Sequence, residues 1–241
     1  MSLNNFDKID YNAIAVIPVR KGSKRVKRKN LRDFQGQSLL EWSISAALKT
    51  PEISNVIVST DDEEAKEIAS NFPVIVLDRP VELASDNADT FDVLKYVVLE
   101  QLPKINLRPD FLVLLQVTSP LRESGLISKG LGKLFSDPLA DRLLELNCTP
   151  FFTGSVASGY WISDFPENMR SQDLPLIYFP SGRLFIYRIA TTISTGDPNG
   201  KNTSFITGDY EENVNIDIEA DFDKLEYVFS KKSEKFNYLL E

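Results

Sequence analysis

Hydrophobic residues in this chain form short unbroken runs that alternate with stretches of helical spacing. Runs that are apolar at consecutive positions are typical of strands buried on both faces. Four such runs are predicted strands, at residues 13–18, 55–58, 74–77 and 110–117. Amphipathic helices are expected between and after them, at residues 38–48, 60–69, 90–102 and 126–135. This alternation predicts an α/β fold, with a mostly parallel sheet and helices on both faces.

The alternating pattern stops after residue 135. Residues 137–180 are rich in proline, aromatic residues and glycine, and are expected to form a small lobe outside the sheet. A returning strand is predicted at 184–187, a loop at 197–208 and a closing helix at 221–230. With no repeat or linker in the sequence, residues 1–241 are interpreted as one domain carrying a lobe at about 137–180.

The composition narrows the possible chemistry. Histidine is absent and Cys148 is the only cysteine, which excludes Ser-His-Asp catalysis, histidine metal sites and paired-cysteine sites. A net charge of −8 disfavours broad binding to nucleic acid or to anionic lipid. No apolar run is long enough to span a membrane and residues 1–10 lack a secretory pattern, so we expect a cytoplasmic protein that binds neither membrane nor nucleic acid.

The positive charge is concentrated in one segment. Residues 20–32 carry eight basic side chains and no acidic one, so the rest of the chain has a net charge of −16. The segment follows the first predicted strand, where ligands of parallel sheets bind, and Gly22 and Ser23 would allow backbone N–H groups to converge. The Walker A and GxGxxG patterns are absent. We interpret the segment as a polyphosphate-binding loop rather than a solvated basic face.

Several segments in order resemble one family. They are IPVRKGSK at 17–24, VSTDD at 58–62, RP with LA and Asp86 at 79–86, LLQ with TSPLR at 114–122, QDLP at 172–175, and Ile216–Asp217 with Asp221 and Glu226. From about residue 12 to 230, the chain resembles the CMP-sialic acid synthetases (acylneuraminate cytidylyltransferases). The resemblance implies a Rossmann-like sheet, a homodimer formed through the lobe, and Mg²⁺-dependent transfer of CMP from CTP to the anomeric hydroxyl of a 2-keto-3-deoxy sugar acid, which releases pyrophosphate.

The resemblance also assigns roles to individual residues. Catalytic roles are implied for Arg20, Lys29 and Asp217. Of these, Arg20 and Lys29 would contact the triphosphate. Nucleotide contacts are implied for the residues Gly22, Ser23, Lys24, Asn30, Asp86 and Thr90. Contacts to the sugar acid are implied for the residues Gln116, Arg122, Arg170 and Gln172. The metal ligands would be Asp217 and Asn215.

The sequence departs from the family at two important points. Asn215 stands where the family usually has an aspartate, which removes one negative charge from the implied metal site. Ser171 stands where an arginine is common, so a bidentate partner for a carboxylate is missing, which Arg170 or Arg183 could replace. The identity of the acid is therefore open, with legionaminic-type, other nonulosonic and octulosonic acids as candidates besides N-acetylneuraminate.

Some readings stay open at this stage. A nucleotidyltransferase that acts on a sugar phosphate or alcohol phosphate would share the loop, and a catalytically silent nucleotide-binding homologue would share most of the motifs. Thr60, Asp61 and Thr90 are equally suited to capping helices. The general base for the anomeric hydroxyl is also open, with Asp217 as one candidate.

Overall fold

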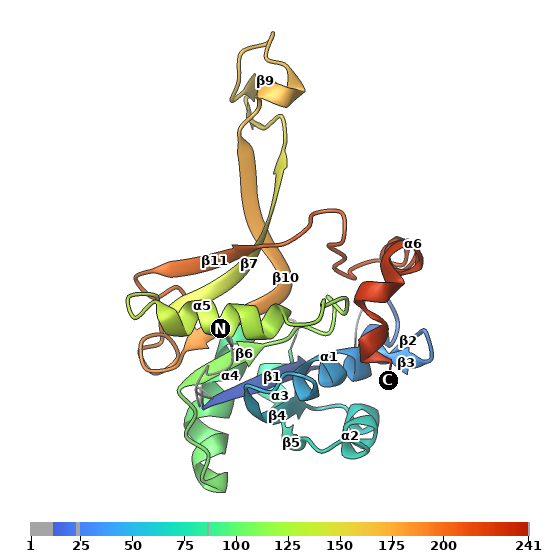
Figure 1. Ribbon diagram of the computed structural model, residues 1–241, viewed down its shortest axis with the longest axis vertical. Helices are drawn as coiled ribbons and strands as arrows, with labels where there is room; N and C mark the ends of the chain where they lie inside the picture. The colour runs from blue at the N-terminus through green and yellow to red at the C-terminus, as the bar shows by residue number, and fades with distance from the viewer. Residues whose placement is uncertain (1–11, 23–24, 86, 241) are drawn as a thin grey trace, which may run out of the picture.

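The fold centres on a mixed sheet of seven strands, described by a computed structural model for residues 12–22, 25–85 and 87–240. The strand order is β11-β7-β10-β6-β1-β4-β5 (Figure 1). Parallel pairing joins β6 (Phe111–Leu114), β1 (Ala13–Val19), β4 (Ile53–Thr60) and β5 (Ile75–Asp78). At the other end β7 (Arg142–Pro150) is parallel to β11 (Thr203–Thr207), and β10 (Leu176–Arg188) is antiparallel to both β7 and β6.

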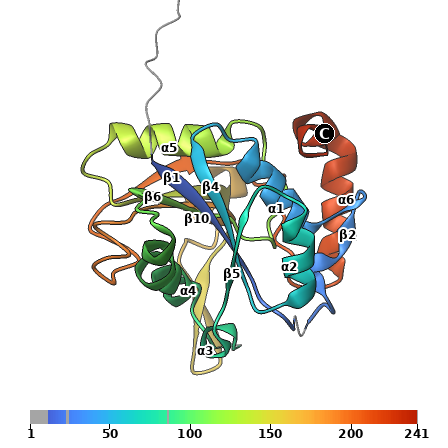
Figure 2. The ribbon, with the colours of Figure 1, turned by 90° about the horizontal axis from the view of Figure 1, so that it is seen from below.

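The sheet is covered on both faces, as the apolar strands predict. In β1, Ala13, Ala15 and Ile17 belong to one buried cluster and Ile14 and Val16 to the other. One group of helices packs with the first of these clusters, and α4 packs with the second on the other side of the sheet (Figure 2). The group comprises α1 (Leu39–Leu48), α2 (Glu63–Ser70), α5 (Leu126–Ser136) and α6 (Ala220–Lys232). On the opposite face, α4 (Thr90–Tyr96) continues through a π-helical turn (Val97–Gln101) into a 3₁₀ turn (Leu102–Ile105). The α/β fold with a mostly parallel sheet is confirmed.

Short elements complete the body. A small hairpin pairs β2 (Asp33–Phe34) with β3 (Gln37–Ser38), and α3 (Val81–Ala84) precedes α4. Further 3₁₀ turns lie at Lys29–Leu31, Ser171–Asp173, Ser233–Lys235 and Asn237–Leu239. Among the described residues, no helix has the length and apolarity needed to span a bilayer.

Three predicted elements are corrected by the structure. The segment 197–208, expected as a loop, contains β11, whose sequence has only two apolar residues, Phe205 and Ile206, but which pairs with β7 over five residues. The returning strand expected at 184–187 is the second half of the 13-residue β10. The strand expected at 110–117 ends at Leu114, which leaves Gln116 beyond the sheet ladder.

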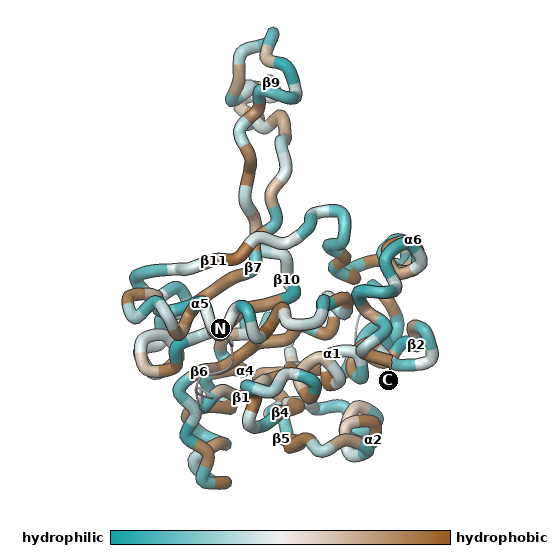
Figure 3. Tube along the Cα trace, in the orientation of Figure 1, coloured by the Kyte–Doolittle hydropathy of each residue, from teal (hydrophilic) through white to brown (hydrophobic). Residues whose placement is uncertain are grey.

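A long arm projects from the body (Figure 1). The far half of β7 pairs with the first half of β10, and the tip carries a hairpin of β8 (Gly154–Ala157) and β9 (Tyr160–Ser163). Residues 142–146 of β7 lie between β10 and β11 in the central sheet, so the arm begins later than the lobe expected from residue 137. Figure 3 shows hydrophobic stretches along the arm, and its tip exposes several large apolar side chains.

Candidate active site

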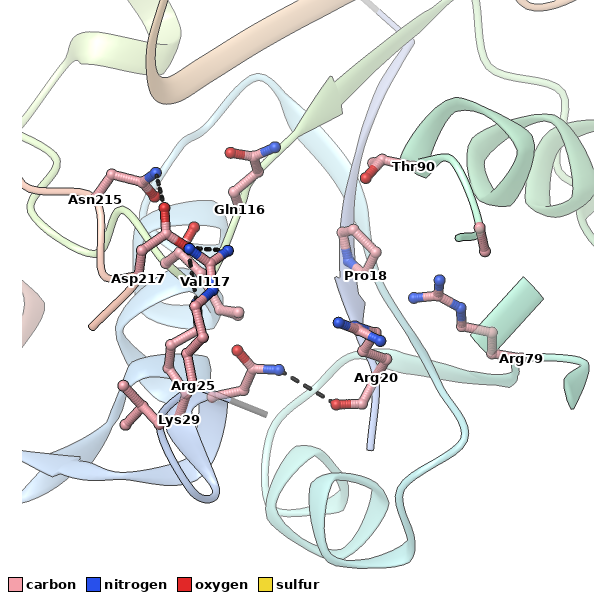
Figure 4. A pocket seen from close by; sticks show the side chains of 14 residues that line it. Pro18, Arg20, Arg25, Lys29, Arg79, Thr90, Gln116, Val117, Asn215 and Asp217 are labelled. Carbon is pink, nitrogen blue, oxygen red and sulfur yellow. Dashed lines mark hydrogen bonds and ion pairs between the residues drawn. The ribbon is translucent and has the colours of Figure 1, made fainter. Parts of the chain in front are cut away.

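A cavity of about 600 Å³ opens at the carboxyl ends of β1 and β6 (Figure 4). Its walls come from five stretches of chain: the end of β1 with the basic loop, the residue after β5, the turn before α4, the segment after β6, and residues 215–217. The lining side chains are Pro18, Arg20, Arg25, Val26, Lys29, Asn30, Arg79, Ala88, Thr90, Gln116, Val117, Thr118, Asn215 and Asp217. The sheet topology therefore brings together motifs that lie as far as 199 positions apart, since the carboxyl ends of neighbouring parallel strands meet at one edge.

The basic loop is held in shape by contacts with its neighbours. The Asn30 side-chain amide donates to the Arg20 carbonyl at 3.3 Å, which closes the loop on itself. The backbone N–H of Lys21 donates to Asp61 Oδ1 at 2.8 Å. Gly22 and Arg28 adopt positive φ angles of 83° and 56°, and at Gly22 this conformation explains the glycine.

Asp217 is the acidic centre of the cavity. Lys29 Nζ donates to the Ile216 carbonyl at 2.6 Å and lies 3.4 Å from Asp217 Oδ1, and Arg25 lies 3.4 Å from the same oxygen. The backbone N–H of Asp217 donates to Asp221 Oδ2 at 2.6 Å, which anchors the segment at the start of α6. Among the described lining residues Asp217 is the only carboxylate, against four basic side chains. The cavity therefore favours an anionic ligand.

Arg79 is the fourth basic residue of the described cavity lining. In the sequence it lies in a segment that resembles the family, but the resemblance assigns it no role in the site. Its guanidinium points toward Arg20 across the cavity (Figure 4) and donates through Nε to the Leu83 carbonyl at 2.6 Å. Burial lowers the pKa of Arg79, an effect that Asp61 opposes and Arg20 reinforces. Arg25 was also missed as a site residue; the high basic content of the loop was the signal that could have included it.

The structure brings together the three predicted catalytic residues and two of the six predicted nucleotide residues. Arg20, Lys29, Asn30, Thr90 and Asp217 all line the cavity. Gly22 instead lines a neighbouring cavity of about 320 Å³ on the other side of the loop, together with Lys21 and Lys27. The predicted contacts at Ser23, Lys24 and Asp86 lie outside the described residues.

The capping predictions change in detail. Asp62, not Thr60 or Asp61, caps α2 by accepting from the Glu64 N–H at 3.1 Å. Asp89, not Thr90, caps α4 by accepting from the Phe91 N–H at 2.9 Å. Thr90 is thereby the first residue of α4 and faces the cavity, as Figure 4 shows.

The predicted sugar-acid residues separate. Gln116 lines the cavity, and Asn215 lies on the same wall beside Asp217. Arg122 is fully buried beneath this wall, so its predicted contact with the substrate is wrong in this structure. Arg170 and Gln172 lie on the arm, and Arg170 pairs with Asp173 at 2.7 Å; neither is part of the cavity lining.

Arg183 cannot replace the missing second arginine. Its side chain is 1% exposed and forms an ion pair with Glu145, with Nε donating to Oε2 at 2.8 Å. Because its guanidinium also reaches the Leu121 carbonyl, it is committed to the interior. Of the predicted sugar-acid residues, only Gln116 lines the cavity within the described part of the chain.

Comparisons with known proteins agree with this geometry. The sequence model of the cytidylyltransferase family matches residues 14–123, which include the basic loop and the wall after β6. Over these residues the chain is similar to the cytidylyltransferase family. It is 34% identical over 181 residues, or 72% of its length, to an N-acylneuraminate cytidylyltransferase of Streptococcus agalactiae serotype V, and that match spans 42% of the relative. It is 29% identical to a pseudaminic acid cytidylyltransferase of Campylobacter jejuni over 71% of this chain and 76% of that one.

A solved structure shows the same fold over nearly the whole chain. A CMP:2-keto-3-deoxy-manno-octonic acid synthetase, complexed with CTP, superimposes with a TM-score of 0.67 at 18% identity, and covers 91% of this chain and 99% of that chain. These matches confirm the resemblance to the acylneuraminate cytidylyltransferases that the ordered motifs indicate. The chain spans about two fifths of the length of the streptococcal relatives, at 42%.

Proposed function

We propose that this protein transfers CMP from CTP to the anomeric hydroxyl of a 2-keto-3-deoxy sugar acid and releases pyrophosphate. The observation that carries the proposal is the cationic cavity at the end of β1, where Arg20, Lys29 and two further basic residues surround one carboxylate. Its volume of about 600 Å³ is within the usual range of small-molecule sites. Relatives that align with 71–72% of this chain are named as cytidylyltransferases of acylneuraminate and pseudaminic acid.

The chemistry requires positioning and charge stabilisation more than a nucleophilic side chain. The anomeric oxygen attacks the α-phosphorus of CTP, the bond from that phosphorus to the bridging oxygen breaks, and the electron pair leaves with pyrophosphate. Negative charge grows on the phosphoryl oxygens and on the leaving group, and Arg20, Arg25 and Lys29 are placed to stabilise it. Asp217 is a candidate to accept the proton of the hydroxyl, since it is the acidic group of the cavity wall.

The two sides of the cavity suit the two parts of the reaction. Arg79, Ala88 and Thr90 line one side, beside the basic loop, and would contact the nucleoside. Gln116 and Thr118 line the other side and would contact the sugar acid with amide and hydroxyl groups. The α-phosphate would lie between these two sides, within reach of Lys29.

The residues at 215–217 suit a magnesium ion that is bound mainly by the phosphates of the enzyme's substrate. Asp217 offers a carboxylate and Asn215 an amide oxygen, and the Asn215 amide lies 3.4 Å from Asp217 Oδ2. The described residues contain no group of three or more acidic, cysteine or histidine side chains that could hold a metal. Mg²⁺ commonly binds through one or two protein oxygens and substrate phosphates, so this donor set fits it. When bound, Mg²⁺ would neutralise phosphate charge.

The arm supports the proposal of a homodimer. Its tip hairpin exposes large apolar side chains, among them Val156, Tyr160 and Trp161 at 72%, 76% and 59%. A two-stranded hairpin is marginally stable in water, and an exposed apolar patch of this kind is typical of an interface. We expect light scattering to report a dimer, and Trp161→Glu to shift it toward monomer. Leu139→Glu, at an exposed apolar position on the body, is the matched control and should leave the dimer intact.

A pyrophosphate-release assay tests the proposed reaction. Each of the four nucleoside triphosphates is incubated with Mg²⁺ and a panel of N-acetylneuraminate, pseudaminic, legionaminic-type and octulosonic acids. We expect turnover with CTP and at least one acid, and a loss of roughly 10²-fold or more in kcat for Arg20→Ala. Lys27→Ala is the control, since Lys27 lines the neighbouring cavity rather than this one.

Each alternative gives a distinct result in this assay. Turnover only with a phosphate-bearing acceptor would indicate a different nucleotidyltransferase. CTP binding without turnover on any acid would indicate a silent homologue. An unchanged rate in Arg20→Ala would contradict the assignment of the cavity. The cytoplasmic location expected from the sequence stays a prediction.

A further inference from the structure

A fully buried guanidinium lies directly beneath the cavity wall. Arg122 has no exposed surface, and its three donor groups reach three separate parts of the fold. Its Nε donates to the Arg183 carbonyl at 2.8 Å, its Nη2 to the Gln116 carbonyl at 2.8 Å, and its Nη1 to Ser43 Oγ at 3.2 Å. Arg122 therefore connects β10, the segment after β6, and α1.

This arrangement is costly for stability alone. Burial lowers the pKa of Arg122 to about 9, which still leaves the side chain charged at neutral pH. None of its three hydrogen-bond partners is a carboxylate, since the nearby Glu145 is paired with Arg183. Burying an ion without a counter-charge carries a large desolvation penalty, so the position of this charge requires an explanation beyond folding.

Two of the three contacts hold groups at the cavity. Gln116 lies beyond the end of β6, outside the ladder, and its side chain projects into the cavity (Figure 4). Arg183 follows Gly182, which adopts a φ of 84° where β10 departs from regular pairing. A Cβ on Gly182 would lie 2.8 Å from Ser119 Oγ and 3.5 Å from Gln116 Oε1, so this backbone packs closely against the Gln116 side chain.

We propose that Arg122 is a positioning residue that fixes the Gln116 amide for the sugar acid by tying its backbone to the Gly182–Arg183 segment. It does not touch the substrate; it holds two pieces of backbone at a set separation. The inference rests on the proposed function for the role of Gln116, whereas the geometry itself is a property of the free protein. A lysine at this position keeps the charge but cannot donate in three fixed directions.

The kinetic test is a double-mutant cycle with Arg122→Lys and Gln116→Ala. We expect Arg122→Lys to raise the KM for the acid roughly 10-fold while the Kd for CTP stays within about 2-fold. In the Gln116→Ala background, Arg122→Lys should add little, because the two changes disrupt the same contact. Additive effects, or an equal loss of CTP affinity, would overturn the proposal.

Ser43→Ala is the matched control. It removes the longest of the three contacts and leaves both carbonyl contacts in place, so the KM for the acid should stay within about 2-fold. If Arg122→Lys does not fold, Tyr238→Phe provides a second variant, since the Tyr238 hydroxyl donates to the Arg122 carbonyl at 3.0 Å. It should raise the KM for the acid in the same direction by a smaller factor, and no change would count against the proposal.

An NMR measurement separates this inference from the proposed reaction. The side-chain amide signals of Gln116 in the free protein should shift in Arg122→Lys and stay in place in Ser43→Ala. Unmoved Gln116 signals in Arg122→Lys would overturn the positioning role whatever the enzyme turns over. If the unmodified protein turns over none of the acids, the proposed function is overturned instead. The NMR result would still decide whether Arg122 positions the Gln116 amide.

Discussion

At the scale of single residues, one ion pair of this protein is fully buried and differs in its energetics from the ion pairs on the surface. Glu145 and Arg183 have side chains that are 0% and 1% exposed, and the Ser181 hydroxyl also donates to Glu145 at 2.6 Å. In the interior each charge depends on its partner, because water cannot replace it. The exposed pair of Arg170 and Asp173 on the arm is solvated and should contribute little.

The first prediction compares these two pairs. Glu145→Gln leaves the Arg183 guanidinium buried without its counter-charge and should lower the free energy of unfolding by roughly 3–5 kcal/mol. Asp173→Asn, the matched control, should lower it by less than about 1 kcal/mol. Urea denaturation followed by fluorescence measures both. Equal effects of the two substitutions would contradict the interior pairing.

The second prediction concerns Asn215. Asn215→Asp adds a negative charge beside Asp217 and should lower the Mg²⁺ concentration needed for half-maximal pyrophosphate release, since hard cations favour carboxylate ligands. A Mg²⁺ titration at fixed CTP and sugar acid measures the change. The control is Asn213→Asp, which adds the same charge outside the lining of the cavity. Identical titration curves for the Asn215→Asp variant and the unmodified protein would rule out 215–217 as the metal site.

At the scale of elements, α1 links the basic loop to the core. The Ser38 N–H donates to Glu41 Oε2 at 2.6 Å, and the Glu41 N–H donates to Ser38 Oγ at 3.3 Å, which together form a capping box. Trp42, which follows directly, is fully buried and donates through its indole N–H to the Phe34 carbonyl at 3.0 Å. The start of this helix thus anchors the hairpin that follows the loop.

The third prediction tests that anchor. Ser38→Ala leaves the N-terminal N–H groups of α1 without their side-chain acceptor and should cost about 1 kcal/mol of unfolding free energy. Ser136→Ala is the control, since its hydroxyl contacts the Lys133 carbonyl at the exposed end of α5 and should change stability by less than about 0.5 kcal/mol. Chemical denaturation distinguishes the two. A loss no larger than that of the control would mean that the cap does not stabilise α1.

At the scale of the whole molecule, burial of ionisable groups gives the fold a defined response to alkaline pH. Tyr187 pairs with Leu112 in the ladder between β10 and β6. It is 6% exposed and its ring lies near that of Phe91. Burial raises its pKa to about 12 from an ordinary value near 10. The folded protein therefore keeps the phenol protonated over a pH range in which the unfolded chain ionises, so stability falls as pH rises from about 10 to 12.

The fourth prediction isolates this contribution. The stability of Tyr187→Phe relative to the unmodified protein should increase by roughly 2–3 kcal/mol between pH 9 and pH 12, because phenylalanine has no proton to lose. The lowered pKa of Arg122 acts in the opposite direction over this range, but it is common to both proteins and cancels in the difference. Urea midpoints measured across the pH series provide the test. A constant difference would show that the Tyr187 phenol is not desolvated.

Much of the architecture follows from local sequence. The apolar run of β1 predicts burial on both faces, the spacing of Ser38 and Glu41 predicts a helix start, and a basic segment after a buried strand predicts an anion site at the edge of the sheet. These properties are carried by neighbours in the chain, since strand and helix periodicities and caps depend on residues a few positions apart. The placement of Arg20 and Lys29 beside the end of β1 follows from this local pattern, whereas Asp217 joins them only through the fold.

Other features depend on contacts that no local pattern carries. Arg122 lies near Gln116 in sequence, but its burial is decided by carbonyls of Arg183 and Gln116 and the hydroxyl of Ser43, brought together only by folding. Likewise, β11 forms a strand because its backbone pairs with that of β7. Arg79 reaches the cavity because β5, which precedes it, ends beside β4. The sequence alone does not distinguish a polar side chain that binds a ligand from one that binds a carbonyl distant in the chain. Only the tertiary structure distinguishes the two, because the free energy of burying that group is set by partners far away in the chain.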